Sequence, residues 1–228
     1  MSKLKVFIEG GLGSGQYITM FLNNGWEETS ELEEADLVQF VGGADVSPHY
    51  YGEDQHPSAY CSEQCDKYTL DLYERAAYLN IPMAGICRGS QFLCVMGGGK
   101  LWQDVDGHAI GRNHSLIDKA TGIVIDDCSS THHQQHRPSD NAIIIATSSP
   151  QLCGYKEGMK DGKILHVDVE TGKMNCSDMS IADDIEAFYY KHINALGFQP
   201  HPEFFNPEHP CQKYYFDLIA KYLNLWSN

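Results

Sequence analysis

Apolar residues gather in short stretches bounded by glycine, proline and polar positions. Residues 5–8, 36–41 and 82–86 are mostly apolar runs of strand length, which is typical of buried strands. Residues 66–79 carry apolar side chains at helical spacing, and residues 89–96 follow the third strand as a helix. Strands that alternate with helices predict an α/β protein whose mostly parallel sheet is covered on both faces.

The second half of the chain continues this alternation with one interruption. Residues 143–146 and 195–199 are expected to be strands, and residues 212–225 a C-terminal helix. Residues 154–184 are polar and punctuated by glycine, and they contain a further strand at 163–169. Because no repeat, low-complexity segment or Pro/Ser-rich linker divides the chain, we interpret residues 154–184 as a hairpin insertion in a single domain that spans residues 1–228.

Charge and hydropathy exclude two classes of partner. The 228 residues include 31 Asp and Glu against 16 Lys and Arg, a formal net charge of −15. Without a cluster of basic residues, this balance argues against nucleic acid, whose phosphates need Lys and Arg. The longest apolar run, 142–146, is far shorter than a transmembrane helix, and residues 1–9 lack the apolar core of a signal peptide. We therefore expect a cytoplasmic protein without membrane contact, with most of its eight cysteines reduced.

One cysteine lies in a pattern that favours nucleophilic chemistry. The segment Gly85-Ile-Cys87-Arg-Gly89 falls between a predicted strand and a predicted helix. A nucleophile on such a sharp turn needs small neighbours two positions away, because the turn is strained and tightly packed. The N-terminus of the following helix favours the thiolate. The alternative is that Cys87 is a small buried apolar residue, as most free cysteines are.

A base and an orienting group for Cys87 are present near the C-terminus. In Gly197-Phe-Gln-Pro-His201-Pro-Glu203, a histidine and a glutamate lie two positions apart after an apolar run. Side chains two apart on an extended segment share a face, so the carboxylate can orient the imidazole. An exposed loop could bring the pair together by chance. Because a cysteine nucleophile requires both groups, we predict that Cys87, His201 and Glu203 act together.

Backbone N–H groups near Cys87 could stabilise the negative charge that acyl transfer builds on a carbonyl oxygen. One comes from Arg88, which follows the nucleophile, and the second from Gly42-Gly43, where a predicted strand ends. The alternative for the glycines is an ordinary strand-to-loop turn.

No sequence pattern predicts a metal or phosphate site. His132-His133-Gln-Gln-His136 contains no acidic residue, and Cys61 and Cys65 lack a second matching pair. The glycine-rich residues 11–15 lack the Lys-Ser/Thr ending of a phosphate loop and are interpreted as a turn.

Five motifs together resemble the class I glutamine amidotransferase-like superfamily, and within it the gamma-glutamyl-gamma-aminobutyrate hydrolase (gamma-glutamyl hydrolase) group. In chain order they are Val41-Gly-Gly-Ala-Asp-Val-Ser-Pro-His-Tyr-Tyr-Gly52, Gly85-Ile-Cys-Arg-Gly-Ser-Gln-Phe-Leu93, Gly97-Gly-Gly-Lys-Leu-Trp-Gln-Asp104, Ser129-Ser-Thr-His-His-Gln134 and His201-Pro-Glu203. The chain departs from the pattern at Ser129, where the group has Asn, and at Pro200, where it has an aromatic residue. The first 35 residues are shorter than the group's, and residues 154–184 are inserted.

The resemblance implies a flavodoxin-like three-layer sandwich with a mostly parallel central sheet and a nucleophile elbow. It also implies a catalytic triad of Cys87, His201 and Glu203. The oxyanion donors would be Gly43 and Arg88, and the substrate-binding residues would be Gln91 and His133.

The function that the resemblance implies is hydrolysis of the gamma-amide of glutamine or of a gamma-glutamyl conjugate, through a thioester on Cys87. No cofactor and no metal are expected. One alternative is a glutaminase subunit that delivers ammonia to a separate ATP-dependent synthetase chain. Another is a catalytically silent binding module, which the intact Cys87, His201 and Glu203 disfavour.

Overall fold

A computed structural model of the chain describes residues 3–10, 14–175 and 183–226. Its helices are α1 (Ser14–Asn23), α2 (Glu63–Tyr78), α3 (Arg88–Met96) and α4 (Pro210–Leu223), with short 3-10 turns η1 (Leu32–Glu34), η2 (Pro48–Tyr51) and η3 (Pro202–Phe204). Its strands are β1 (Lys5–Ile8), β2 (Glu27–Glu28), β3 (Leu37–Phe40), β4 (Met83–Ile86), β5 (Lys100–Trp102), β6 (Asp104–Val105), β7 (His114–Asp118), β8 (Val124–Cys128), β9 (Gln135–Arg137), β10 (Ala142–Ser149), β11 (Tyr155–Lys160), β12 (Lys163–Asp168), β13 (Ile185–Tyr190) and β14 (Ala195–Phe198).

A nine-stranded sheet forms the centre of the protein, in the order β2-β1-β3-β4-β14-β13-β10-β7-β8. The strands from β2 to β14 pair in parallel, and from β14 onward each pairing is antiparallel. Only β13 and β7 therefore run against the others, so seven of the nine strands share one direction. This confirms the predicted α/β class with a mostly parallel central sheet.

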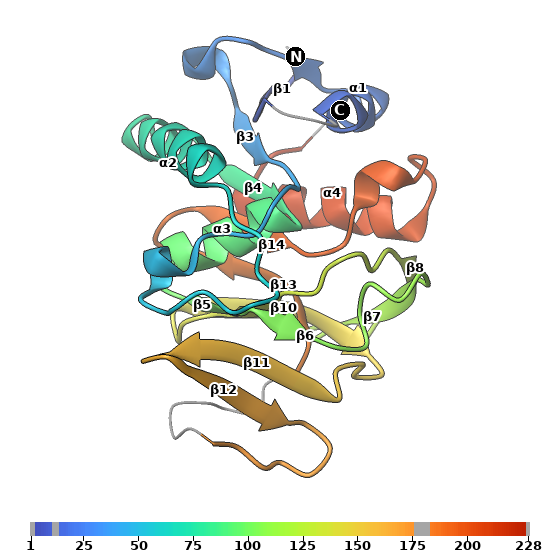
Figure 1. The fold of residues 1–228 in the computed structure, drawn as a ribbon. Coiled ribbons are helices and arrows are strands. Elements are labelled where there is room, and N and C mark those ends of the chain that lie inside the picture. The colour runs from blue at the N-terminus through green and yellow to red at the C-terminus, as the bar shows by residue number, and fades with distance from the viewer. Residues whose placement is uncertain (1–2, 11–13, 176–182, 227–228) are drawn as a thin grey trace.

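Helices cover both faces of this sheet and produce three layers (Figure 1). Side chains of α1 and α4 pack with β1, β4 and β14 in one apolar core, whereas those of α2 and α3 pack with β3, β4 and β13 in a second. Every residue of β4 and β14 is buried, as expected for central strands between two helical layers.

A small second sheet lies away from the helical layers, at the bottom of Figure 1. In it β11 and β12 form an antiparallel hairpin with Tyr155 opposite Asp168, and β11 also pairs with β6. This hairpin occupies the first part of the segment 154–184. Residues 176–182 of that segment, and residues 11–13 of the predicted glycine turn, lie outside the described residues.

Three neighbouring strands position the candidate site. β3, β4 and β14 are adjacent and parallel, so their carboxyl ends meet at one edge of the sheet. Ligand sites of open α/β sheets lie at this edge. Cys87 directly follows β4, whereas Gly42 lies two residues after the end of β3 and His201 three residues after the end of β14.

Within the described part of the chain, no helix is long and apolar enough to cross a membrane.

Candidate functional site

Cys87 connects β4 to α3 in a strained turn. Its backbone has φ 51° and ψ −112°, a conformation that residues other than glycine rarely adopt. The turn depends on its flanking glycines: a Cβ on Gly85 would lie 2.4 Å from the carbonyl carbon of Gly89, and a Cβ on Gly89 would lie 2.5 Å from the Phe40 oxygen. The close packing of these glycines leaves Cys87 at the tip of the turn, partly exposed to solvent.

His201 and Glu203 are held against each other beside this turn. The His201 Nδ1 donates to Glu203 Oε1 over 2.6 Å, and both side chains are largely buried. The ring of His201 stacks on Phe204 with centroids 4.6 Å apart and planes 3° from parallel. The His201 backbone N–H donates to Ser129 Oγ over 2.7 Å. Because Nδ1 is bound to Glu203, Nε2 is the nitrogen that remains for Cys87.

Charged neighbours raise the pKa of His201. Burial by itself lowers this pKa, but the charge and hydrogen bonding of the Cys87 sulfur, together with the Glu203 carboxylate, raise it to about 10. The raised pKa favours the imidazolium form of His201. A protonated imidazole between a sulfur and a carboxylate can stabilise a thiolate and donate a proton to a leaving amine.

The loop after β3 closes over the nucleophile. A Cβ on Gly42 would lie 3.0 Å from Cε1 of His201, 3.1 Å from the Tyr17 hydroxyl and 3.8 Å from Cβ of Cys87. The Gly42 N–H donates to the Tyr17 hydroxyl over 2.9 Å. Of the two glycines, Gly43 is thus the one whose N–H donates to no acceptor among the described residues. Gly43 is therefore the glycine whose N–H can serve as the predicted oxyanion donor.

Arg88 has separate roles for its backbone and its side chain. It is the first residue of α3, where a backbone N–H has no partner inside the helix. Its guanidinium is buried and donates to Asp66 Oδ1 over 2.7 Å and to Thr69 Oγ1 over 2.9 Å, both on α2. The side chain therefore connects α3 to α2, while the backbone N–H lies at the N-terminus of α3, directly after Cys87.

The sequence analysis missed two residues of this site. Tyr17 on α1 is buried, and its hydroxyl lies next to the Glu203 carboxylate as well as to Gly42. Burial and the negative charge of Glu203 raise the pKa of Tyr17, so its hydroxyl stays protonated. No sequence pattern connects α1 with this site. Ser129, whose Oγ accepts from the His201 N–H, stands where the family has Asn, and this departure from the motif was a sequence signal that could have identified it.

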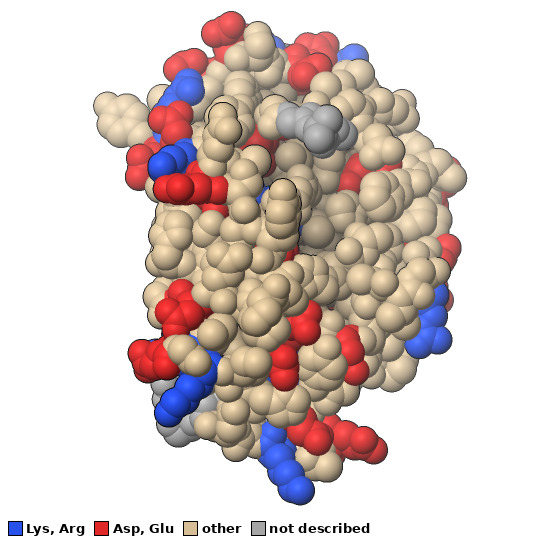
Figure 2. Space-filling model, in the orientation of Figure 1, with Lys and Arg blue, Asp and Glu red and all other residues tan. Residues whose placement is uncertain are grey.

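A cavity of about 510 Å³ opens beside the loop after β3. Its wall includes Gly42, Gly43 and Arg88 as well as Glu9 at the end of β1 and Tyr68 on α2. Figure 2 shows this face hollowed, with acidic and basic atoms deep in the hollow. The cavity is large enough for a small polar molecule and adjoins the candidate oxyanion donors.

Gln91 lies on α3, one turn after Cys87, and is buried. Its amide nitrogen donates to the Gln134 carbonyl over 3.4 Å and to Gln199 Oε1 over 3.3 Å. Both of its N–H groups are therefore directed at the protein, and only its oxygen is left for a ligand.

His133 lies between two carboxylates at the rim of the site. Its Nε2 is 3.2 Å from Asp45 Oδ2, its Nδ1 is 3.4 Å from Asp104 Oδ1, and 39% of its side chain is exposed. The hydrogen bond with Asp45 is the largest effect and raises the pKa of His133, while partial burial opposes it. The three side chains together offer both charges to a ligand.

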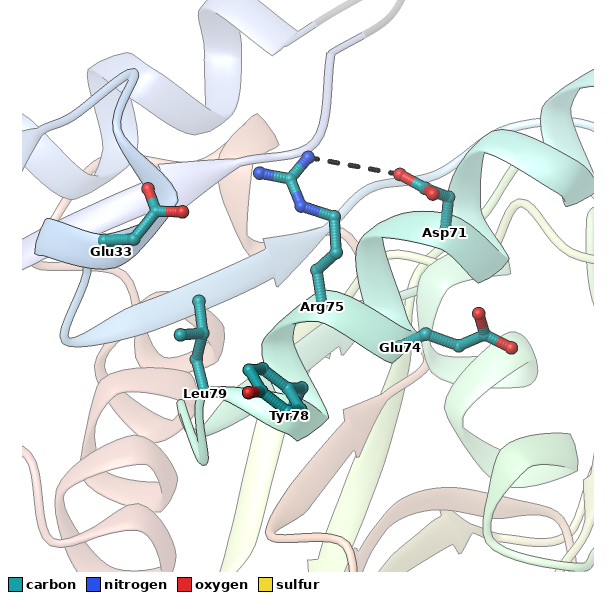
Figure 3. Close-up of a pocket in the computed structure, with 6 residues that line it drawn as sticks. All are labelled: Glu33, Asp71, Glu74, Arg75, Tyr78 and Leu79. Carbon is teal, nitrogen blue, oxygen red and sulfur yellow. Dashed lines mark ion pairs between the residues drawn. The ribbon is translucent and has the colours of Figure 1, made fainter.

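A second pocket, of about 300 Å³, lies between η1 and the C-terminal half of α2. Figure 3 shows Arg75 extending between Glu33 and Asp71, with a 4.0 Å ion pair to the latter. Its lining residues include neither a cysteine nor a histidine, so they cannot form a pair like that of Cys87 and His201.

Comparisons with known proteins place the chain in a family. The family described as Peptidase C26 matches residues 19–203. The chain is 39% identical over 75 residues to a protein of Lactococcus lactis subsp. cremoris named "Putative glutamine amidotransferase-like protein YvdE homolog". That match covers 32% of this chain and 40% of the relative, so it spans well under half of the relative's length.

Solved structures share the whole fold at low sequence identity. The structure of PurLQS from Thermotoga maritima has a TM-score of 0.64 and 18% identity, and the match covers 98% of this chain and 100% of the other. A structure described as a "putative gmp synthase subunit a protein" from Thermoplasma acidophilum has a TM-score of 0.58 and 16% identity, over 98% of both chains. These values indicate a common fold of the glutamine amidotransferase type.

Proposed function

The chain belongs to the Peptidase C26 family, and from this premise we propose that it is a cysteine amidohydrolase of the class I glutamine amidotransferase type. Its substrate is the gamma-amide of glutamine or of a gamma-glutamyl conjugate. The observation that carries the proposal is the strained turn at Cys87 beside a His201 that is bound through Nδ1 to Glu203 over 2.6 Å.

The first half-reaction forms a thioester. The Cys87 sulfur, its proton held on His201, attacks the gamma-carbonyl carbon of the substrate. The oxygen of the tetrahedral intermediate accepts hydrogen bonds from the Gly43 and Arg88 N–H groups. As the C–N bond breaks, His201 Nε2 transfers its proton to the departing nitrogen, and ammonia or an amine leaves while Glu203 retains its negative charge.

The second half-reaction releases glutamate. Neutral His201 takes a proton from a water molecule, which attacks the thioester carbonyl, and the same two N–H groups stabilise the second oxyanion. The C–S bond then breaks, and the thiolate of Cys87 and the imidazolium of His201 are restored. The proton that His201 gives to the leaving nitrogen is regained from the attacking water, and the new gamma-carboxylic acid releases its own proton to solvent.

The substrate's amino-acid head is proposed to bind at the rim. The raised pKa of His133 favours its charged form, which suits a carboxylate, and the neighbouring Asp45 and Asp104 suit an ammonium group. Gln91 can accept a further hydrogen bond through its side-chain oxygen. A gamma-glutamyl group carries both of these charges at one end and the reacting amide at the other.

A turnover assay tests the proposal. The purified chain is incubated with glutamine and with a panel of gamma-glutamyl amines, and glutamate release is measured for wild type and for the Cys87→Ala variant. We expect hydrolysis of at least one gamma-glutamyl amide, weaker turnover of free glutamine and loss of both in the variant. Turnover that persists in Cys87→Ala would overturn the assignment.

A second candidate is a glutaminase subunit that supplies ammonia to a separate synthetase chain. It is favoured by the structural neighbours, one described as a GMP synthase subunit and one as PurLQS. A chain that is inert on the whole panel, yet labelled at Cys87 by an electrophilic glutamine analogue, would support this second function and contradict the first.

A further inference from the structure

Four buried side chains that no step of the proposed reaction uses converge behind the candidate site. We call them the His3Glu cluster, and its members are His108, His114, His132 and Glu186. They come from the loop after β6, the first residue of β7, the loop between β8 and β9, and β13. The four side chains are at most 5% exposed, so water does not solvate them.

The ring nitrogens of the cluster surround one carboxylate oxygen. Glu186 Oε1 is 3.4 Å from His114 Nε2, 3.9 Å from His108 Nδ1 and 3.9 Å from His132 Nε2. In a tetrahedral zinc site with bonds of about 2.0–2.1 Å, neighbouring donor atoms are separated by roughly 3.3–3.5 Å. The donor atoms of His108, His114 and Glu186 all lie within 4.8 Å of one another, and His132, whose Nε2 is 3.9 Å from Glu186 Oε1, has to move toward them to become the fourth ligand.

Several donor atoms of the cluster have no partner. Both ring nitrogens of His114, Nε2 of His132 and Oε2 of Glu186 are buried without a hydrogen-bond partner in the described parts of the chain. Buried polar atoms are normally paired, and the unpaired His114 Nε2 and His132 Nε2 both face the Glu186 carboxylate, which points to a ligand among them. The ligand should be a cation, because unprotonated ring nitrogens and carboxylate oxygens offer lone pairs.

The charge of Glu186 leads to the same conclusion. Among the described residues, its only ion-pair neighbours are the three histidines, whereas Lys156 lies 2.8 Å from Asp184 Oδ1. A fully buried carboxylate is costly without a compensating positive charge. That charge must come from a protonated imidazole or from a bound cation.

The outer partners of two histidines match those of metal ligands. His132 Nδ1 lies 2.8 Å from the Gln134 carbonyl oxygen and must donate to it, which leaves the lone pair on Nε2 directed into the cluster. His108 Nε2 lies 3.4 Å from Asp184 Oδ2, whereas its Nδ1 lies 2.9 Å from Ser130 Oγ and 3.9 Å from Glu186 Oε1, so a metal ion would replace Ser130 as the partner of Nδ1. A metal-bound histidine typically donates its other N–H to a carbonyl or carboxylate in this way.

We propose that the His3Glu cluster binds one structural zinc ion. Three imidazoles and a carboxylate suit zinc, and four protein ligands close the coordination sphere and leave no open position for catalysis. The ion would fix the segment that carries His132, and with it Ser129, whose Oγ accepts from the His201 N–H, and His133 at the rim. Sequence spacing does not reveal the site because its acid comes from a different strand.

Metal analysis of the tag-free chain tests the proposal. We expect about one zinc ion per purified chain, and a lower Tm after removal by a chelator, reversed by added Zn²⁺. Co²⁺ alone, added to the chelated protein, should give the absorption bands of tetrahedral coordination. Loss of a residue that only hydrogen-bonds to a metal ligand typically weakens metal binding by about 10- to 100-fold. His114→Ala removes a ligand itself and should therefore weaken Zn²⁺ binding by a larger factor.

A matched control is His192→Ala, which removes an exposed histidine and should leave metal binding unchanged. The proposal is overturned if the chelated wild-type chain, still folded by circular dichroism, binds neither Zn²⁺ nor Co²⁺. That result would mean that a protonated imidazole compensates Glu186. Equal loss of metal in His192→Ala and His114→Ala would also overturn it. If His114→Ala fails to fold, the wild-type titration decides alone.

Discussion

Replacing Glu203 by Gln removes the charge that holds His201 while preserving the shape of the side chain. The 2.6 Å contact between His201 Nδ1 and Glu203 Oε1 joins an imidazolium to a carboxylate that is 1% exposed. A glutamine can still accept a hydrogen bond through its amide oxygen, so the ring keeps a partner. The variant therefore separates the electrostatic role of Glu203 from its contribution to packing.

The magnitude follows from the strength of this contact. A hydrogen bond to a charged group contributes about 1.5–3 kcal/mol, and 1.36 kcal/mol corresponds to one pKa unit and to a tenfold rate change. In Glu203→Gln the pKa of His201 should fall by about 1–2 units from its value of about 10. If the full contact is lost in the transition state, kcat should fall about 10- to 200-fold. This loss is smaller than that expected for Cys87→Ala.

Two measurements check this expectation. The first is the rate of glutamate release from a gamma-glutamyl amide. The second is the pH dependence of Cys87 alkylation by iodoacetamide, whose upper inflection should move to lower pH as His201 loses its proton earlier. The raised pKa of His201 also contributes to the stability of the folded protein. Because this pKa lies above 6.5 in the folded state, the contribution is complete below about pH 6.5 and is lost as pH rises through about 10.

The control is Glu208→Gln, which removes an exposed carboxylate that pairs with Lys213 over 2.6 Å. It should change neither the rate nor the pH profile. An unchanged kcat in Glu203→Gln would refute the electrostatic role of Glu203. A lower kcat with an unmoved pH profile would show that Glu203 acts through packing alone.

Three further changes test the site. A glutamine analogue with a gamma electrophile should add its mass to the Cys87 peptide and leave Cys94, whose pKa burial raises to about 12, unlabelled; equal labelling would contradict the assignment. Tyr17→Phe should lower kcat by about 2- to 13-fold through the loss of one hydrogen bond, and an unchanged kcat would argue against a positioning role. In an NMR titration the pKa of His133 should lie above 6.5, and Asp45→Asn should lower it. The stabilisation from the pair of His133 with Asp45 is then complete below pH 6.5 and is lost as pH rises through the raised pKa. A pKa at or below 6.5 would contradict the pairing.

The parts of the fold that could be predicted from sequence are those in which local pattern and burial agree. β4 and β14 are continuous apolar runs, and the structure buries every residue of both. The turn between β4 and α3 is marked by Gly85 and Gly89, because no larger side chain fits at either position. Such constraints act over a few residues, so they remain visible in the sequence.

The parts that were missed depend on contacts between distant segments. β13 was not predicted because Glu186 interrupts its apolar pattern, yet this glutamate is completely buried among histidines from other segments. Tyr17 lies on a helix whose spacing only shows that one face is buried. Its position against Gly42 follows from how α1 packs on the sheet. Neither contact has a local signature.

The state of the site bears on the choice between a free-standing hydrolase and a glutaminase subunit. A subunit that depends on a partner is expected to keep its site incomplete until that partner docks, since this prevents wasteful hydrolysis. In the single chain the turn at Cys87 is formed, His201 is bound to Glu203, and the Gly43 N–H donates to no described acceptor. This arrangement is the one expected of the free-standing hydrolase that we propose. A partner would then act on product release or on substrate access. Turnover of the substrate panel by the isolated chain distinguishes a free-standing hydrolase from a subunit that depends on a partner.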